Sequence, residues 1–212
     1  MDGNNRWAKK NNINIFKSYS KGANNLLKLT SAIFEKTEVR YITAFGLSSN
    51  NLKRSKDIIN TIVKILDQNL DKALNKDLNF SIYIKGNLNF LNSKLKKKIE
   101  LLNSRGSMKE KKLIILINFS GRQDIIDTLA VINKLKSNIN IKKYLENSIL
   151  DGLPDPDMLI RTGGFNRLSD FLLFNISFTE LFFTKKLWPD LSYYHVKQLI
   201  NKYFKIERKF GL

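Results

Sequence analysis

The sequence predicts an α/β protein that folds as a single domain. Short apolar segments alternate with longer amphipathic stretches along the chain, which is the pattern of β-strands joined by crossover helices. No internal repeat and no linker rich in proline or glycine divides the 212 residues. A chain of this length with 42% hydrophobic residues can bury one substantial core, so we expect residues 1–212 to form one domain.

Five segments are predicted to be strands because apolar residues fill them or alternate along them. The middle segment, Leu113–Phe119, is apolar along nearly its whole length, as expected for a buried strand with parallel neighbours. The predicted strands are Tyr41–Leu47, Phe80–Lys85, Leu113–Phe119, Met158–Arg161 and Glu180–Thr184.

Six longer stretches are predicted to be helices. In Asp57–Leu74, apolar side chains and one asparagine, Asn69, recur at helical spacing and form one face. Either core packing or the wall of a hydrocarbon tunnel would explain this face, and core packing is favoured. The predicted helices are Gly22–Glu35, Asp57–Leu74, Phe90–Ser104, Asp124–Lys136, Leu168–Asn175 and Tyr194–Arg208.

The composition limits the class of partner. A net charge of +18 favours an anionic partner, which could be a nucleic acid, a diphosphate or an acidic lipid surface. The basic runs Lys94–Lys98 and Lys109–Lys112 are interpreted as solvated surface. The absence of cysteine excludes disulfides and fits a reducing, cytoplasmic setting. No apolar run reaches the roughly 20 residues that cross a bilayer, so we expect a soluble protein or one that contacts a membrane surface.

The first residues combine groups that suit an anion site at the start of a helix. Backbone N–H groups at a helix start attract phosphate, Gly3 would let the backbone come close, and Arg6 could grip phosphate oxygens. Asp2 could hold Mg²⁺, whose other ligands would be phosphate oxygens and water. An ordinary helix cap is the alternative explanation of this segment taken alone.

A second set of polar residues follows the predicted strand Met158–Arg161. Because ligands bind beyond the carboxyl ends of parallel strands, Arg161, Arg167 and Ser169, with the glycine turn between them, are expected to form a second diphosphate pocket. Two anion sites imply two diphosphates. Glu180 could complete a metal shell or orient its waters, and a surface salt bridge is the alternative.

Together these motifs resemble the undecaprenyl diphosphate synthase family of cis-prenyltransferases. The resemblance is carried by the opening MDGNxRWA, the segments FGLSSNNLKR and NFSGRQDI, the block PDPDMLIRTGG…RLSDFLL…ELFFT…LWPD and the closing ERKFG. It extends over essentially the whole chain. It implies a central, mostly parallel sheet flanked by helices, a hydrophobic tunnel for the growing chain and a homodimer.

The resemblance also implies an activity. The enzyme would be a Mg²⁺-dependent transferase that joins isopentenyl diphosphate to an allylic diphosphate, expected to be farnesyl diphosphate. The absence of an obvious insertion in Asp57–Leu74 favours a medium-length product such as undecaprenyl diphosphate, the precursor of the bacterial cell-wall carrier lipid. The metal and the cationic side chains would stabilise the departing diphosphate. The enzyme is expected in the cytoplasm, with peripheral contact to the inner face of the membrane for product release.

Residue roles are implied by matching positions to the family motifs. Asp2 is implied as the catalytic and Mg²⁺-binding aspartate, Glu180 as the second metal-linked carboxylate and Asn51 as a further catalytic residue. Arg161, Arg167 and Ser169 match the site for isopentenyl diphosphate. The residues matched to the allylic diphosphate are Gly3, Asn4, Arg6, Trp7 and Arg54, and Gly121 and Arg122 match a further motif.

The sequence departs from the family pattern at several site positions. Ile15 and Tyr19 stand where the family carries an arginine and a histidine that contact the allylic diphosphate. Phe165 replaces the glutamate that follows Arg-Thr-x-Gly. The other departures are Asn50 and Leu52 for Glu and Trp in the central motif, and Lys209 for arginine in the closing motif. The family also has a short leading strand before the Met-Asp-Gly, so a longer natural chain is expected.

Two other functions compete with catalysis. A family member that only binds prenyl diphosphate or serves as a partner subunit would explain the departures, but it has no reason to keep Asp2 among phosphate-binding arginines. A nucleic-acid-binding protein would explain the charge, but the sequence has no helix-turn-helix, zinc or ribonucleoprotein signature. Nucleic acid is therefore not an expected partner.

Overall fold

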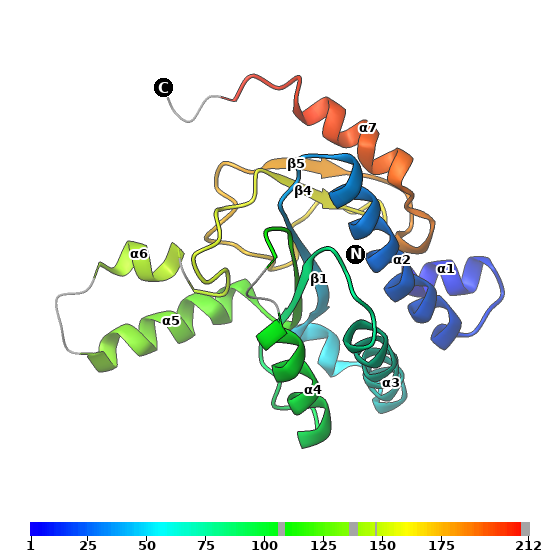
Figure 1. Ribbon diagram of the computed structural model, residues 1–212, viewed down its shortest axis with the longest axis horizontal. Coiled ribbons are helices and arrows are strands. Elements are labelled where there is room, and N and C mark those ends of the chain that lie inside the picture. Colours follow the sequence, from blue (N-terminus) through cyan, green and yellow to red (C-terminus); the bar gives the residue numbers. More distant parts are fainter. Residues whose placement is uncertain (106–108, 136–139, 147, 209–212) are drawn as a thin grey trace.

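A computed structural model describes residues 1–105, 109–135, 140–146 and 148–208. The strands run through the middle of the molecule and the helices lie around them (Figure 1). All strand pairs within this part of the chain are parallel. The predicted single-domain α/β fold, with a parallel sheet flanked by helices, is confirmed.

The larger sheet has three strands, β1 (Tyr41–Ser48), β2 (Ser81–Lys85) and β3 (Lys112–Phe119). Their spatial order is β1-β3-β2, and Lys112 lies opposite both Tyr41 and Ser81. β3 is therefore the central strand, which explains why its sequence is almost wholly apolar.

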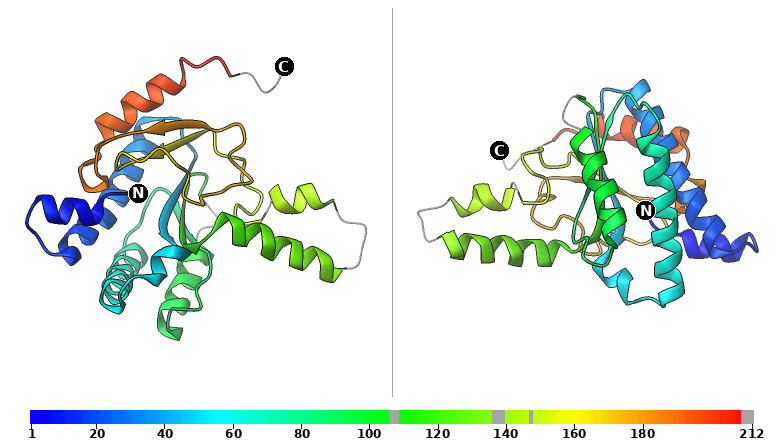
Figure 2. Two further views of the ribbon diagram at one scale, coloured as in Figure 1. Left: turned by 180° about the vertical axis from the view of Figure 1, so that it is seen from behind. Right: turned by 60° about the horizontal axis from the view of Figure 1, so that its bottom comes forward.

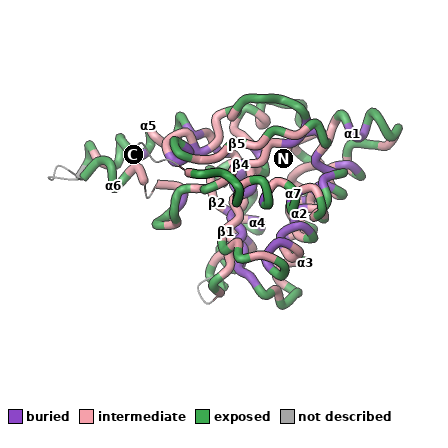
Figure 3. The backbone as a smooth tube through the Cα atoms, turned by 90° about the horizontal axis from the view of Figure 1, so that it is seen from above, coloured by how far each residue is buried: buried purple, intermediate pink, exposed green. Residues whose placement is uncertain are grey.

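The hydrophobic core is divided by this central strand. Leu113 and Ile117 pack in one cluster, together with side chains of the helices, whereas Ile114 and Leu116 pack in a second cluster on the other face. Successive side chains of a strand point to opposite faces, so one apolar segment serves both clusters. Figure 3 shows the buried residues gathered around the sheet and the helices that cover it.

The second sheet has two parallel strands, β4 (Met158–Arg161) and β5 (Glu180–Phe183). Met158 lies opposite Glu180, and Arg161 lies opposite Phe183. All five predicted strands are confirmed, but they lie in two sheets of three and two strands.

The helices form a layer that packs back onto the strands. α4 packs on β2, α3 lies against both α4 and α2, and α1 and α7 lie against α2. Both views of Figure 2 show α5 and α6 projecting away from the rest of the molecule. The helices are α1 (Asn4–Lys10), α2 (Ile15–Lys36), α3 (Lys56–Leu74), α4 (Ser93–Ser104), α5 (Gly121–Leu135), α6 (Ile141–Glu146) and α7 (Tyr193–Tyr203), with 3-10 turns at Ser49–Lys53 and Trp188–Asp190.

The prediction of a helix at Leu168–Asn175 is wrong. Ser169, Asp170 and Leu172 have φ angles of 51°, 68° and 41°, in the left-handed region, which a right-handed helix of L-residues cannot contain. This segment instead forms bends and turns. Its turns are held by contacts with distant residues, described below, so the local apolar pattern did not reveal them.

Other helix boundaries also differ from the predictions. α2 begins at Ile15, seven residues before the expected start, because the Asn14 side chain accepts a hydrogen bond of 2.8 Å from the Lys17 amide and caps the helix. α7 ends at Tyr203 rather than at Arg208. The short helix α6 was not predicted, and Lys136, the predicted end of α5, lies outside the described residues.

The basic run Lys94–Lys98 is not simply solvated surface. Lys98 Nζ lies 2.6 Å from Asp67 Oδ1 and 2.5 Å from Asp71 Oδ1, so the last lysine of the run joins α4 to α3. These two carboxylates, by hydrogen bonding, raise the pKa of Lys98 above its ordinary value. Among the described helices, none has the length and hydrophobicity needed to cross a membrane.

Candidate active site

Gly3 starts α1 in a conformation that other residues rarely adopt. Its φ angle is 115°, and a Cβ atom at this position would lie 2.9 Å from Leu187 Cδ2. Trp7 donates from its backbone to the Gly3 carbonyl at 2.8 Å, which begins the helix. Gly3 is therefore needed to turn the chain from Asp2 into α1 against the segment before Trp188.

Asp2 is anchored to the end of β4 by Thr162, a residue that the sequence analysis missed. The Asp2 amide donates to Thr162 Oγ1 at 2.8 Å, and the same hydroxyl donates to the Asp2 carbonyl at 2.9 Å. The Trp188 amide also donates to that carbonyl at 3.0 Å. Thr162 is 2% exposed, so this link is shielded from water.

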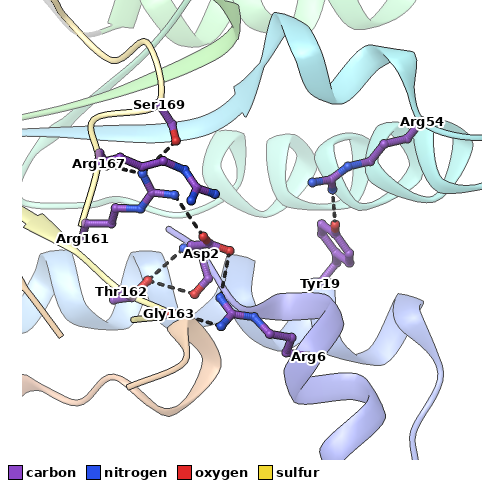
Figure 4. Close-up of polar contacts among 9 residues, drawn as sticks. All are labelled: Asp2, Arg6, Tyr19, Arg54, Arg161, Thr162, Gly163, Arg167 and Ser169. Atoms are coloured by element: carbon purple, nitrogen blue, oxygen red, sulfur yellow. Dashed lines mark hydrogen bonds and ion pairs between the residues drawn. The ribbon is translucent and has the colours of Figure 1, made fainter. Parts of the chain in front are cut away.

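The Asp2 carboxylate lies between two arginines (Figure 4). Its Oδ1 is 3.4 Å from Arg6 Nη2, and its Oδ2 is 3.2 Å from Arg161 Nη2. Arg6 also donates from Nη1 to the Gly163 carbonyl at 2.6 Å. The side chains of Asp2 and Arg6 are 37% and 45% exposed, whereas Arg161 is 12% exposed. One carboxylate therefore orders two guanidinium groups at a surface that a ligand can reach.

Arg161 also organises the loop that follows β4. It donates from Nη1 to Ser169 Oγ at 2.7 Å and to the Arg167 carbonyl oxygen. The next residue, Asp170, accepts from Ser120 Oγ at 2.5 Å and from the Arg122 amide at 2.9 Å. The left-handed turn at Ser169 and Asp170 is thus tied to the motif at Gly121-Arg122, which places Ser169 beside Arg161.

Phe165 lies among the arginines of this group. The distances from its ring centroid to the guanidinium Cζ atoms are 4.2 Å for Arg167, 4.7 Å for Arg6 and 5.7 Å for Arg161. All three fall within the range of attractive cation–π contacts. The sequence analysis noted Phe165 only as a departure from a family pattern.

Arg54 and Tyr19 form a separate pair. Arg54 donates from Nη1 to the Tyr19 hydroxyl at 2.7 Å, and the Arg54 amide donates to the Asn51 carbonyl at 3.2 Å. Figure 4 draws this pair with no polar contact to the Asp2 group. The described contacts do not join Arg54 or Asn51 to Asp2. Tyr19 therefore supplies a hydroxyl to Arg54 at the position where the family pattern has a histidine.

Asn4 and Trp7 are held in the body of the protein. Ser18 Oγ donates to the Asn4 carbonyl at 2.6 Å, while the buried side-chain oxygen Asn4 Oδ1 has no hydrogen-bond partner among the described residues. Trp7 is 8% exposed and donates from Nε1 to Asp190 at 2.7 Å. Asn4 Oδ1 lies close to α2, since a Cβ atom at Gly22 would be only 2.5 Å from it.

No contact described in the structure joins Glu180 to Asp2. Glu180 begins β5, whereas Arg161 lies three residue steps along, at the other end of the paired strand β4. This offset corresponds to about 10 Å along a strand. Within the described part of the chain, no three acidic, histidine or cysteine side chains lie close enough together to hold a metal. A metal role for Glu180 stays a prediction, and so does the role of Lys209, which lies outside the described residues.

Fold and site together define an α/β protein with a group of three arginines and one aspartate at the carboxyl end of its strand β4. The prenyltransferase family described as undecaprenyl diphosphate synthase matches residues 1–211. An isoprenyl transferase of Thermotoga maritima is 34% identical over 219 residues, covering 100% of this chain and 94% of that protein. The chain belongs to the undecaprenyl diphosphate synthase family.

Two solved structures extend this similarity to three dimensions. A probable undecaprenyl diphosphate synthase from Campylobacter jejuni has a TM-score of 0.80 and 30% identity, over 91% of this chain and 93% of that chain. Lavandulyl diphosphate synthase from Lavandula x intermedia, solved with dimethylallyl diphosphate, has a TM-score of 0.89 over 100% of this chain and 95% of that chain. At 24% identity, the second similarity concerns the fold alone.

Proposed function

We propose that the protein condenses isopentenyl diphosphate with an allylic prenyl diphosphate, as a Mg²⁺-dependent cis-prenyltransferase. The observation that carries this proposal is the Asp2 carboxylate held between Arg6 and Arg161, 3.4 Å and 3.2 Å away. It joins the two predicted diphosphate sites, one at the start of α1 and one at the end of β4. A reaction between two diphosphates requires this proximity, because it depends on positioning the reacting carbons.

The residues of the two sites have separate tasks in the proposed reaction. Arg161, Arg167 and Ser169 would bind isopentenyl diphosphate, whose double bond attacks the allylic carbon. The bond from that carbon to its diphosphate oxygen breaks, and the diphosphate leaves with the bonding electrons. Arg6 would stabilise the negative charge on this leaving group. Loss of a proton from the isopentenyl unit then gives the new cis double bond.

The site would offer Mg²⁺ a single carboxylate ligand from the protein. Mg²⁺ is commonly held by one or two carboxylates together with substrate phosphates and water. Asp2 is the carboxylate in reach of the arginine group, and its side chain is partly exposed. When bound, the metal would neutralise phosphate charge. Asp2 would hold the metal, and Arg6 and Arg161 would bind phosphate oxygens.

Farnesyl diphosphate is the proposed acceptor and undecaprenyl diphosphate the proposed product. The name of the Campylobacter jejuni structure, 30% identical to this chain, supports an undecaprenyl product. The tunnel for the growing chain, the chain length of the product and its use as a cell-wall carrier lipid remain predictions.

We further propose a homodimer with peripheral contact to the membrane. The helices α5 and α6, which project from the rest of the molecule (Figure 1), support a dimer because they carry several large apolar side chains that are exposed to solvent. These side chains are Ile126, Leu129, Val131, Ile141 and Tyr144. A cytoplasmic location and membrane contact follow only from the proposed substrates.

The test is synthesis of a polyprenyl chain. Purified protein is incubated with farnesyl diphosphate, labelled isopentenyl diphosphate and Mg²⁺, and products are separated by chain length. We expect a Mg²⁺-dependent ladder that Asp2→Ala abolishes and that Asp77→Asn, a change in a fully exposed carboxylate outside the site, leaves unchanged. The absence of product from the wild-type protein, with diphosphate binding retained, would favour the less supported alternative of a binding or partner subunit. Activity in Asp2→Ala would contradict the site assignment.

A further inference from the structure

The Phe165 ring lies beside three arginine side chains and carries no charge that would neutralise them. Its ring lies within 5.7 Å of the guanidinium carbons of Arg6, Arg161 and Arg167, which belong to α1, β4 and the loop after β4. The carboxylate bound to this group is that of Asp2, which contacts Arg6 and Arg161. Three positive charges and one negative charge leave this arginine group with a net charge of +2. Such a group attracts a multivalent anion.

The three arginines differ in what else holds them. Arg6 and Arg161 donate to backbone carbonyls and to Asp2, so their positions are fixed by hydrogen bonds. The guanidinium of Arg167 contacts the Phe165 ring at 4.2 Å, and no carboxylate or carbonyl partner for it is found in the described part of the chain. Phe165 is therefore the contact that orders the Arg167 side chain.

A cation–π contact and anion binding can use different parts of a guanidinium. When its carbon lies over an aromatic ring, its N–H donors stay available and can bind two phosphate oxygens at once. A carboxylate at position 165 would instead accept from those donors and lower the net charge. Phe165 is 38% exposed, so the ring lies at the open side of the site.

We propose that Phe165 is a positioning residue of the diphosphate site: its ring holds Arg167 beside Arg6 and Arg161 and leaves the N–H groups of Arg167 free for a diphosphate. This inference rests on the proposed function for the identity of the ligand as isopentenyl diphosphate. Because the net charge is retained, the arginine group binds free diphosphate without a divalent cation.

The binding test uses calorimetric titration of the full chain with inorganic diphosphate in the presence of EDTA. Phe165→Leu, which keeps an apolar side chain but removes the ring, is expected to weaken binding about 10-fold, whereas Phe165→Trp keeps it within about threefold. Phe165→Glu is expected to weaken binding at least as much as Phe165→Leu. Phe204→Leu, at an exposed aromatic residue outside the site, serves as the matched control. No binding to the wild-type protein, or an effect of Phe165→Leu below twofold, would overturn the inference.

A double-mutant cycle separates positioning from general stability. If Phe165 acts through Arg167, Phe165→Leu should weaken binding much less in an Arg167→Ala background than in the wild-type protein. Additive losses would overturn the inference. The arginine side-chain NMR signals supply a measurement that needs no stable variant: in the wild-type protein, ring-current shifts of the Arg167 Nε–H signal are expected, and their absence would contradict the stacking.

Repeating the titration with isopentenyl diphosphate and with farnesyl diphosphate shows which substrate carries the diphosphate that binds the arginine group. The loss in Phe165→Leu is expected with isopentenyl diphosphate, and a loss confined to farnesyl diphosphate would contradict the placement. These measurements require no turnover. Failure to synthesise polyprenyl chains would therefore overturn the proposed function while the binding pattern of Phe165 variants still decides the role of the ring.

Discussion

The Thr162 hydroxyl accepts a hydrogen bond from the Asp2 amide at 2.8 Å and donates one to the Asp2 carbonyl at 2.9 Å. These two residues are 160 positions apart in the sequence. One buried side chain therefore fixes the backbone of the candidate catalytic aspartate to the strand end that carries Arg161. The distance between the two proposed diphosphate sites depends on this link.

Replacing Thr162 with valine is expected to reduce both stability and activity. Valine has the same shape but cannot hydrogen bond, so the Asp2 amide loses the partner that anchors it, at a cost of about 1–3 kcal/mol in the free energy of unfolding. Urea denaturation measures this loss, and the product assay measures activity. Thr128→Val removes a buried hydroxyl that donates at 2.7 Å within α5, leaves the Asp2 anchor intact and should keep wild-type activity. Equal activity in both variants would contradict a positioning role for Thr162.

Gly163 and Gly164 offer a matched pair of substitutions. Both have left-handed backbones, with φ angles of 89° and 77°, so alanine at either position is expected to cost about 1–2 kcal/mol in stability. A Cβ atom at Gly163 would lie 2.5 Å from Arg6 Nη2, whereas at Gly164 its nearest neighbour is 3.7 Å away. Gly163→Ala should therefore raise the KM for a diphosphate substrate several-fold more than Gly164→Ala. Steady-state kinetics of the two variants, compared at matched stability, checks this expectation.

The hydrogen bond between Arg54 and Tyr19 predicts a role for the tyrosine hydroxyl. Tyr19→Phe removes the acceptor 2.7 Å from Arg54 Nη1, which should release that side chain and lower kcat/KM for the allylic substrate by about threefold to tenfold. Tyr19→His, which restores an imidazole at this position, should retain more activity than Tyr19→Phe. Tyr194→Phe, at a residue 66% exposed, is the control. If Tyr19→Phe matches the wild-type protein, the pair has no part in substrate binding.

Asp124 predicts a pH dependence of stability. Burial raises the pKa of this carboxyl above its ordinary value, which the hydrogen bond from Ser148 at 2.8 Å only partly offsets. The folded state therefore holds the proton more tightly than the unfolded state, so this group contributes stability at low pH that is lost as pH rises through the raised pKa. Asp124→Asn should stabilise the protein at pH 7 relative to wild type, and the difference should shrink towards pH 4. Urea denaturation at both pH values tests this, and a difference that grows as pH falls would contradict it.

The strands were predictable because their signal is local. The apolar run Leu113–Phe119 is buried on both faces, and the seven consecutive residues show the pattern of such a strand. The division into two sheets was not predictable, because strand pairing depends on long-range contacts. The predicted helix at Leu168–Asn175 failed for the same reason: the Asp170 side chain binds Ser120 and the Arg122 amide, and these contacts stabilise left-handed turns that the local sequence does not favour.

The sequence by itself determined the α/β class, the family and the residues that meet at the candidate site, Asp2, Arg6 and Arg161 among them. These conclusions depend on periodicity and on motifs, which are properties of neighbouring residues. Only the tertiary structure decided that Thr162 anchors Asp2, that the Phe165 ring lies within 5.7 Å of three guanidinium carbons and that Glu180 lies at the opposite end of the β4–β5 pair from Arg161. Each of these relationships joins segments brought together by folding, and their geometry depends on strand register and backbone angles that no single segment specifies.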